Sequence, residues 1–344
     1  MSKLGFRLLR WFLILLPLRV AAHDAPTGEP FLGPFEKPRP RELTIPRGSE
    51  NFDAYEALHG SFSSMDQCAR VPNGLWIEVD GTGDCVRYYA QGLDANRNAN
   101  VLVYFGGDVM LRTSKGVRRI GASYRRQSPS TLLNEMAEWS MEGKTAALYL
   151  ARPGTYGSSG DHNMRRHPRE VALLNRALDV LKAQYKISFF ILAGHSGGGH
   201  VVASLLNKRR DVLGAAISSG VVSTTQVAHY WEKRRKIRGS LLYDADKFYN
   251  PVADIHQISR DPKPTIFVIS DPEDRVVPFF SQLYYVRRLR HAGLDPHHIY
   301  AHAPGPQRHS LSRHARLAAA MIARGNTTKE IVRALGELDL EQFE

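Results

Sequence analysis

The chain has 344 residues, of which 43% are hydrophobic and 23% are charged. This length suits one large α/β domain or two small ones, and the composition is ordinary for a globular protein. The formal net charge of +12 is expected mainly to aid solubility, and weak association with anionic surfaces of a cell envelope is the alternative. However, the sequence lacks the combined basic and aromatic motifs of nucleic-acid-binding proteins, so we expect no nucleic-acid partner.

Residues 1–22 have the pattern of a secretory signal peptide. Three basic residues precede the apolar stretch 11–18, and small residues at 20–22 suit signal peptidase. The apolar stretch is too short to span a bilayer comfortably. We therefore predict an exported protein, periplasmic or secreted, with a retained membrane anchor as the alternative.

After the signal, residues 23–60 are rich in proline and charge in their first part, which predicts an N-terminal arm or linker before a domain at 61–344. The chain has two cysteines, Cys68 and Cys85. In an oxidising compartment such a pair is most simply a disulfide, and two unrelated buried thiols are the alternative. Partner ligands at metal-site spacing are missing, so we expect no metal and no other cofactor.

From residue 75 the chain alternates between strand and helix patterns. Stretches 75–79 and 85–90 predict an antiparallel hairpin. Further strands are predicted at 100–105, 145–151, 188–194, 213–220, 264–270 and 298–302. Helices are predicted at 130–141, 169–185, 198–210, 281–293, 316–325 and 327–338. This alternation predicts an α/β fold with a mostly parallel sheet covered by helices on both faces, and active groups gather at the carboxyl ends of such strands.

A candidate nucleophile lies where strand 188–194 meets the next helix. The sequence there is Gly194-His195-Ser196-Gly197-Gly198-Gly199. It matches the G-x-S-x-G nucleophile elbow, in which a strained serine needs small neighbours between a strand and a helix. A plain glycine-rich turn is the competing interpretation.

A candidate acid follows strand 264–270, where Asp271, Glu273 and Asp274 share one loop. We favour Asp274, because it directly precedes the apolar stretch that starts the next element. Asp271 remains the alternative, although its place before Pro272 suits a residue that begins a turn.

Three histidines near the last strand compete for the role of general base. His302 ends the strand and His314 falls inside the following helix, whereas His309 lies in the loop between them. We favour His309, because only a loop position there is free to bend back over the serine. Nearby Ser310 and Ser312 are candidate caps of the helix.

The turn after strand 100–105 is a candidate oxyanion hole. Backbone N–H groups of Gly107 or Asp108, together with that of Gly197, would converge on one oxygen. A simple turn explains the glycines equally well.

With these motifs in this order, the chain resembles the α/β-hydrolase superfamily over residues 70–325. Ser196, Asp274 and His309 follow the order of that superfamily's catalytic triad. The segments "GHSGGG", "YFGGD" and "RPGTYGSSG" sit where the superfamily has corresponding elements. Residues 271–293 look like the end of dienelactone-hydrolase-like and prolyl-oligopeptidase-like catalytic domains. The resemblance implies the α/β-hydrolase fold and a Ser-His-Asp mechanism.

Residues 221–264 form a connection longer than most, and we expect a small helical cap there. Its aromatic side chains either line a substrate pocket or anchor the cap to the core; they are Tyr230, Trp231, Tyr243, Phe248 and Tyr249.

The function expected from these features is hydrolysis of a carboxylic ester through an acyl-enzyme. The substrate would be a small-molecule or polymer-derived ester. A serine peptidase or an acyltransferase of the cell envelope would use the same residues, and a non-catalytic binding protein on a hydrolase scaffold is the alternative from another class. The oligomeric state is left open.

Overall fold

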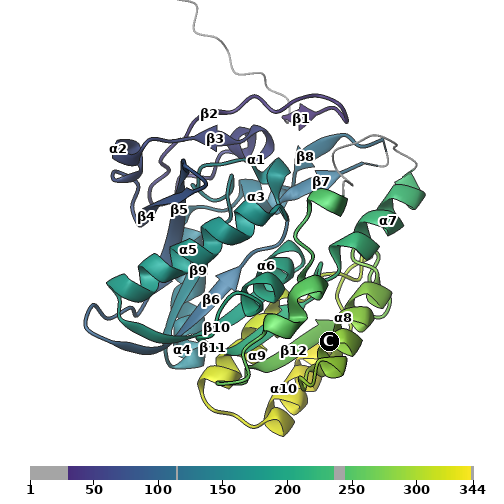
Figure 1. The fold of residues 1–344 in the computed structure, drawn as a ribbon. Coiled ribbons are helices and arrows are strands. Elements are labelled where there is room, and N and C mark those ends of the chain that lie inside the picture. Colours follow the sequence, from purple (N-terminus) through teal and green to yellow (C-terminus); the bar gives the residue numbers. More distant parts are fainter. Residues whose placement is uncertain (1–29, 114, 236–244, 342–344) are drawn as a thin grey trace, which may run out of the picture.

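A central sheet of eight strands organises the protein. The computed structural model describes residues 30–113, 115–235 and 245–341 (Figure 1); the predicted signal peptide lies outside them. The strands of the sheet are β4 (Gly74–Val79), β5 (Thr82–Gln91), β6 (Asn98–Phe105), β9 (Ala146–Leu150), β10 (Ile187–His195), β11 (Val212–Ser218), β12 (Thr265–Ser270) and β13 (His297–Tyr300).

The strand order is β13-β12-β11-β10-β6-β9-β5-β4. Neighbours from β13 through β9 are parallel, and the β9–β5 and β5–β4 pairs are antiparallel. The predicted hairpin and the predicted mostly parallel sheet are therefore confirmed.

Helices cover both faces of this sheet. The alternation along β6 shows why: Val101, Val103 and Phe105 belong to one apolar cluster, and Leu102 and Tyr104 belong to the other. A strand buried on both sides must be apolar at every position, which explains its continuous hydrophobic sequence. One face packs against α5 (Pro168–Gln184), α6 (Gly197–Leu206) and α8 (Phe279–His291), and the other against α4 (Pro129–Gly143), α9 (Ser312–Ala323) and α10 (Thr328–Glu341).

Helix α9 begins four residues earlier than predicted, at Ser312, with Leu311 at its N-cap and no side-chain cap. The two serines named as candidate caps therefore do not cap it. His314 lies inside this helix, as predicted.

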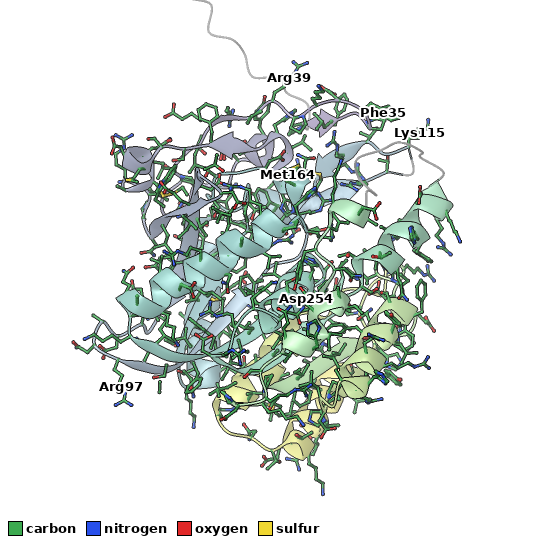
Figure 2. The ribbon with its side chains drawn as sticks, viewed as in Figure 1. Phe35, Arg39, Arg97, Lys115, Met164 and Asp254 are labelled. Carbon is green, nitrogen blue, oxygen red and sulfur yellow. A yellow bond between two sulfur atoms is a disulfide. The ribbon has the colours of Figure 1, made fainter. Side chains whose placement is uncertain are left out.

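The described part of the predicted arm packs onto the domain. Strand β1 (Phe31–Leu32) joins β8 (Arg118–Ile120) and β7 (Met110–Arg112) in a small sheet of order β1-β8-β7. The buried Arg118 guanidinium donates to the carbonyl oxygens of Gly33 at 3.0 Å and Glu36 at 2.6 Å. Figure 2 shows Phe35 and Arg39 of the arm at the same end of the molecule as Lys115, between β7 and β8.

The remaining elements are short. The arm and its surroundings contain β2 (Arg41–Glu42), α1 (Ala54–His59), β3 (Ser61–Phe62), α2 (Met65–Cys68), α3 (Ala122–Arg125) and the 3₁₀ turn η1 (His162–Met164). The described parts of the predicted cap contain three helical segments: α7 (Thr224–Arg235), η3 (Ala245–Lys247) and η4 (Pro251–Gln257). Among the described helices, none combines the length and apolarity that crossing a membrane requires.

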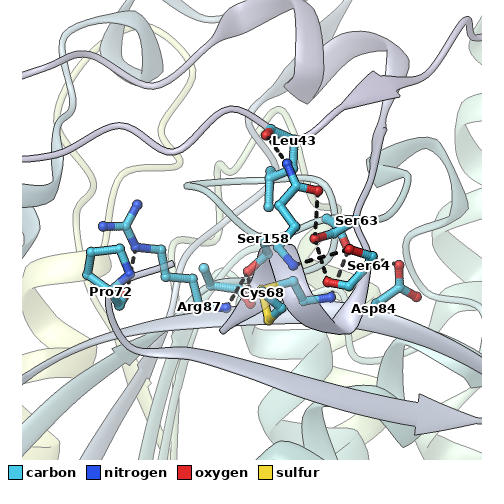
Figure 3. The surroundings of a disulfide bond; sticks show 12 residues. Leu43, Ser63, Ser64, Cys68, Pro72, Asp84, Arg87 and Ser158 are labelled. Atoms are coloured by element: carbon cyan, nitrogen blue, oxygen red, sulfur yellow. Dashed lines mark hydrogen bonds between the residues drawn. A yellow bond between two sulfur atoms is a disulfide. The ribbon is translucent and has the colours of Figure 1, made fainter. Parts of the chain in front are cut away.

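The predicted disulfide is present and joins α2 to β5 (Figure 3). The Cα atoms of Cys68 and Cys85 lie 5.4 Å apart, and both side chains are buried. Beside them, Arg87 donates through Nε to the carbonyl oxygen of Pro72 at 3.1 Å, and its backbone N–H donates to the Ser158 hydroxyl at 2.9 Å. The disulfide therefore fastens the start of the domain to β5, the strand next to the edge strand β4.

Reducing this disulfide is expected to lower the free energy of unfolding by about 3 kcal/mol, because the link restricts the unfolded chain. Denaturant unfolding of the oxidised and reduced protein measures the difference. The double variant Cys68→Ala/Cys85→Ala is the control, because added reductant should leave its stability unchanged. Equal stability of the oxidised and reduced wild type would contradict the expectation.

Candidate active site

Ser196 occupies a strained turn between β10 and α6. Its backbone has φ 54° and ψ −116°, a conformation that costs a non-glycine residue free energy. The glycines around it are sterically required, because a Cβ on Gly198 would overlap the carbonyl oxygen of Phe105 and one on Gly194 would overlap the backbone of Gly198. The sharp turn thus presents the serine at the carboxyl end of β10, as the elbow motif predicts.

His309 pairs with Asp274 in the loops that follow β13 and β12. The His309 Nδ1–H donates to Asp274 Oδ2 at 2.8 Å. The other oxygen of Asp274, Oδ1, accepts the backbone N–H groups of Val276 at 2.8 Å and Val277 at 2.9 Å. The carboxylate is therefore held in place by the backbone while it orients the imidazole, which leaves Nε2 available for proton transfer.

The two competing histidines lie elsewhere. His314 Nε2 contacts Asp339 Oδ1 at 2.8 Å, and the backbone N–H of His302 donates to the same oxygen at 3.3 Å. Both residues therefore help to dock α10. Of the three candidates, the structure brings only His309 into the cleft that contains Ser196.

Asp271 is occupied by structural contacts. It is fully buried and accepts from Arg308 Nε at 2.8 Å and from the backbone N–H groups of Ala303 and Glu273, each at 2.8 Å. Burial alone would raise its pKa, but the hydrogen bonds from Arg308 and the backbone hold the pKa of Asp271 below its usual value. Asp271 thus braces the loop on which His309 lies, and Glu273 is exposed beside it.

A second imidazole lies against His309. The His195 ring centre is 4.8 Å from that of His309, and its Nδ1 lies 3.2 Å from the Ser218 hydroxyl. Burial and the neighbouring His309 lower the pKa of His195 to about 3. His195 is therefore neutral near pH 7 and adds no positive charge beside the candidate base.

The predicted oxyanion residues surround the serine. A Cβ on Gly107 would lie 3.3 Å from the Ser196 Cβ, so the turn after β6 runs directly beside the nucleophile. Gly197 is the first residue of α6, where an amide N–H has no acceptor within its own helix. The backbone at Gly107, Asp108 and Gly197 is thus gathered at one place.

Ser196 and His309 line a cleft of about 590 Å³. Two of the predicted aromatic residues, Trp231 and Phe248, line it as well. Tyr230 is absent from the lining and packs against Trp231 and Phe280 instead. Tyr249 anchors the cap to the core, because its hydroxyl accepts from Asn207 at the end of α6 at 3.1 Å while it donates to Asp254 within the cap at 2.8 Å. Tyr243 lies outside the described residues.

A buried ionic cluster, not predicted from the sequence, lies beside the elbow. Asp108 accepts from Arg152 at 2.9 Å, from Arg165 at 3.0 Å and from Arg166, and Arg152 also donates to Glu170 at 2.8 Å. Burial alone would raise the pKa of Asp108, but these arginines hold it well below its usual value. The available signal was Asp108 following the glycine turn, together with the charged stretch at 165–170.

Acid should weaken this cluster. Burial alone would raise the pKa of Glu170, but Arg152 lowers it from 4.5 to about 2. Because this pKa is depressed in the folded state, the stabilisation is present above pH 4.5 and is lost as the pH falls toward 2. We expect wild type to exceed Glu170→Gln in unfolding free energy by about 3 kcal/mol at pH 7, and the gap to narrow below pH 4.5. Urea unfolding between pH 7 and pH 3 measures it, and a gap that does not change with pH would refute the electrostatic cause.

Searches for related proteins give matches in structure only. No protein-family model and no curated protein sequence matches the chain. AbyA5 matches in structure with a TM-score of 0.52 and 17% identity, over 80% of this chain and 74% of that one. An esterase of Pyrococcus furiosus matches with a TM-score of 0.48 and 13% identity, over 86% of this chain and 98% of that one.

An acylaminoacyl peptidase of Pyrococcus horikoshii also matches, with a TM-score of 0.48 and 14% identity over 79% of this chain. The chain spans 42% of that peptidase's length. The strand order, the serine turn after β10, and the loops after β12 and β13 that bring Asp274 to His309 follow the arrangement that the motifs predict. The chain therefore has the fold of the α/β-hydrolase superfamily.

Proposed function

We propose that the protein is an exported serine hydrolase that cleaves a carboxylic ester through an acyl-enzyme intermediate. The observation that carries the proposal is the Asp274–His309 hydrogen bond of 2.8 Å in the cleft where the strained Ser196 is presented. A serine hydroxyl is a weak nucleophile on its own, and an oriented imidazole is the base that activates it.

In the proposed reaction, Ser196 Oγ attacks the ester carbonyl carbon while His309 Nε2 takes the hydroxyl proton. The carbonyl oxygen becomes an oxyanion, and backbone N–H groups at Gly197 and at the Gly107–Asp108 turn stabilise it. The intermediate then expels the alcohol, which receives its proton from His309. Water, deprotonated by His309, attacks the acyl-enzyme in the same way, and the carboxylic acid leaves as the serine regains its proton.

Asp274 would hold the imidazole in the required tautomer and stabilise the imidazolium as it forms. The residues present complete this reaction without a metal or cofactor. Two observations support export: the signal-like sequence at 1–22 and the disulfide, a bond that persists in oxidising compartments. Cell fractionation and N-terminal sequencing of the mature protein test this part.

A fluorophosphonate probe tests the enzymatic part, because it reacts with activated serines. We expect labelling of wild type and none of Ser196→Ala. A panel of esters, peptides and acceptor alcohols then separates ester hydrolysis from peptidase and acyltransferase activity. Absence of labelling and of turnover on the whole panel would favour a binding protein on a hydrolase scaffold.

A further inference from the structure

The cleft beside Ser196 is strongly cationic. Among the described residues that line it, the only carboxylate is Asp108, whereas five are arginines: Arg112, Arg119, Arg165, Arg166 and Arg275. Guanidinium groups are charged at any pH at which the protein is folded. The lining is therefore positive even after Asp108 is counted.

The buried ionic cluster at the inner end of the cleft has more positive than negative groups. Arg152, Arg165 and Arg166 face two carboxylates, those of Asp108 and Glu170. The side chains of these arginines are 2%, 5% and 15% exposed, so water screens them little. In the described part of the chain, Arg166 Nε is buried without a hydrogen-bond partner.

The neighbouring His162 does not change this balance. Its side chain is fully buried next to Asp108, and burial together with Arg152 and Arg165 lowers its pKa well below the usual value. The imidazole is therefore neutral near pH 7. The cluster, with its one excess positive charge, lies directly beside the elbow, since a Cβ on Gly197 would overlap Asp108 Oδ1 and lie 2.6 Å from an Arg152 guanidinium nitrogen.

Two exposed arginines on separate segments add positive charge at the outer part of the cleft. Arg119 lies on β8 opposite Leu111 of β7, and Arg275 follows Asp274, with its backbone N–H donating to the Gln307 carbonyl at 3.0 Å. Both arginines are exposed, and within the described ranges neither forms an ion pair. Their guanidinium groups are thus available to a ligand in the cleft.

Much of the remaining lining is apolar and includes Met110, Leu111, Trp231 and Phe248. The neutral polar residues Thr224, Gln307 and Ser310 also line the cleft. A ligand that fits this cleft would therefore combine an apolar body with a negative charge.

We infer that the substrate is an ester that carries a free carboxylate in addition to its ester group. This inference rests on the proposed function for the ester and on the arginine-rich lining for the carboxylate. A planar carboxylate matches the guanidinium fork, and charge-assisted hydrogen bonds of this kind are about twice as strong as neutral ones. An uncharged ester would leave the excess positive charge of the cleft unpaired.

Two stable esters of equal chain length test the inference. Monoethyl glutarate ends in a carboxylate where ethyl pentanoate ends in a methyl group. Dissociation constants are measured by titration calorimetry on Ser196→Ala, so that binding is read without turnover. The same titrations are made on Ser196→Ala carrying both Arg119→Gln and Arg275→Gln, and on Ser196→Ala carrying Arg97→Gln.

Arg97 is the matched control. It is exposed and directly precedes β6, at the opposite end of the sheet from the cleft. Figure 2 shows it far from Lys115 of the β7–β8 connection. Its replacement removes one positive charge from the molecule without changing the cleft.

We expect monoethyl glutarate to bind at least tenfold more tightly than ethyl pentanoate. The Arg119→Gln/Arg275→Gln pair should reduce this preference about tenfold, Arg97→Gln should leave it unchanged, and salt at 0.5 M should weaken it because exposed charges are screened. Equal binding of the two esters, no binding of either, or a preference insensitive to the arginine pair overturns the inference.

Hydrolysis of the two esters by the wild-type protein tests the proposed function independently of the binding measurements. If monoethyl glutarate binds preferentially but wild type hydrolyses neither ester, the carboxylate-binding cleft stands and ester hydrolysis falls. If wild type hydrolyses both esters and binding shows no preference, ester hydrolysis stands and the carboxylate inference falls.

Discussion

Replacing Ser196 with alanine should reduce ester turnover by about 10⁴-fold or more, because the attacking oxygen is lost and no acyl-enzyme can form. The fold should survive, since alanine differs from serine by one oxygen and the side chain lies at the cleft surface. Steady-state kinetics on the best ester of the panel measure the loss, and thermal unfolding confirms that the variant is folded.

Ser310 provides the matched control. It also lines the cleft and is exposed, but it belongs to the loop that bears His309 rather than to the elbow. Ser310→Ala should keep turnover within about tenfold of wild type. Turnover of Ser196→Ala that remains within tenfold of wild type would remove Ser196 from the mechanism.

Asparagine in place of Asp274 should lower kcat by about 10⁴-fold, because an amide favours the wrong tautomer of His309. In the structure, Asp274 Oδ2 accepts the Nδ1–H of His309 at 2.8 Å. An amide nitrogen at this position would instead donate to Nδ1 and place the proton on Nε2, where the base must be free. Substrate affinity should change far less than kcat.

Asp271→Asn is the comparison, because it removes a carboxylate three residues away. Asp271 contacts Arg308 rather than His309. We expect this variant to lose about 1–3 kcal/mol of unfolding free energy while kcat falls far less than in Asp274→Asn. If Asp271→Asn is the catalytically crippled variant and Asp274→Asn is mild, the assignment of the acid is reversed and the hydrolase proposal survives.

Sequence alone determined the parts of this protein that depend on local pattern. Continuous apolar runs such as residues 101–105 require burial on both faces of a strand. Amphipathic segments such as 169–185 require burial of one helix face only. Strands and helices could therefore be placed from their residue patterns. The elbow at Ser196 could be recognised because steric crowding demands glycines at fixed positions. A pair of cysteines in a chain with a signal-like start was enough to predict the disulfide.

The sequence could only partly decide whether Asp274 or Asp271 is the acid. Both carboxylates follow the same strand, and their order along the chain does not say which one meets an imidazole. The structure separates them through contacts with distant segments, since Arg308 binds Asp271 while His309 binds Asp274.

Only the tertiary structure decided the character of the cleft. Its arginines come from β7, β8, the loop before α5 and the loop after β12, segments that no sequence period connects. Among the cap aromatics, Phe248 lines the cleft while its neighbour Tyr249 bonds to Asp254 and Asn207. The physical reason is common to both cases: local residue type sets the backbone, whereas charge balance and side-chain direction in a cleft depend on which distant segments the sheet brings together.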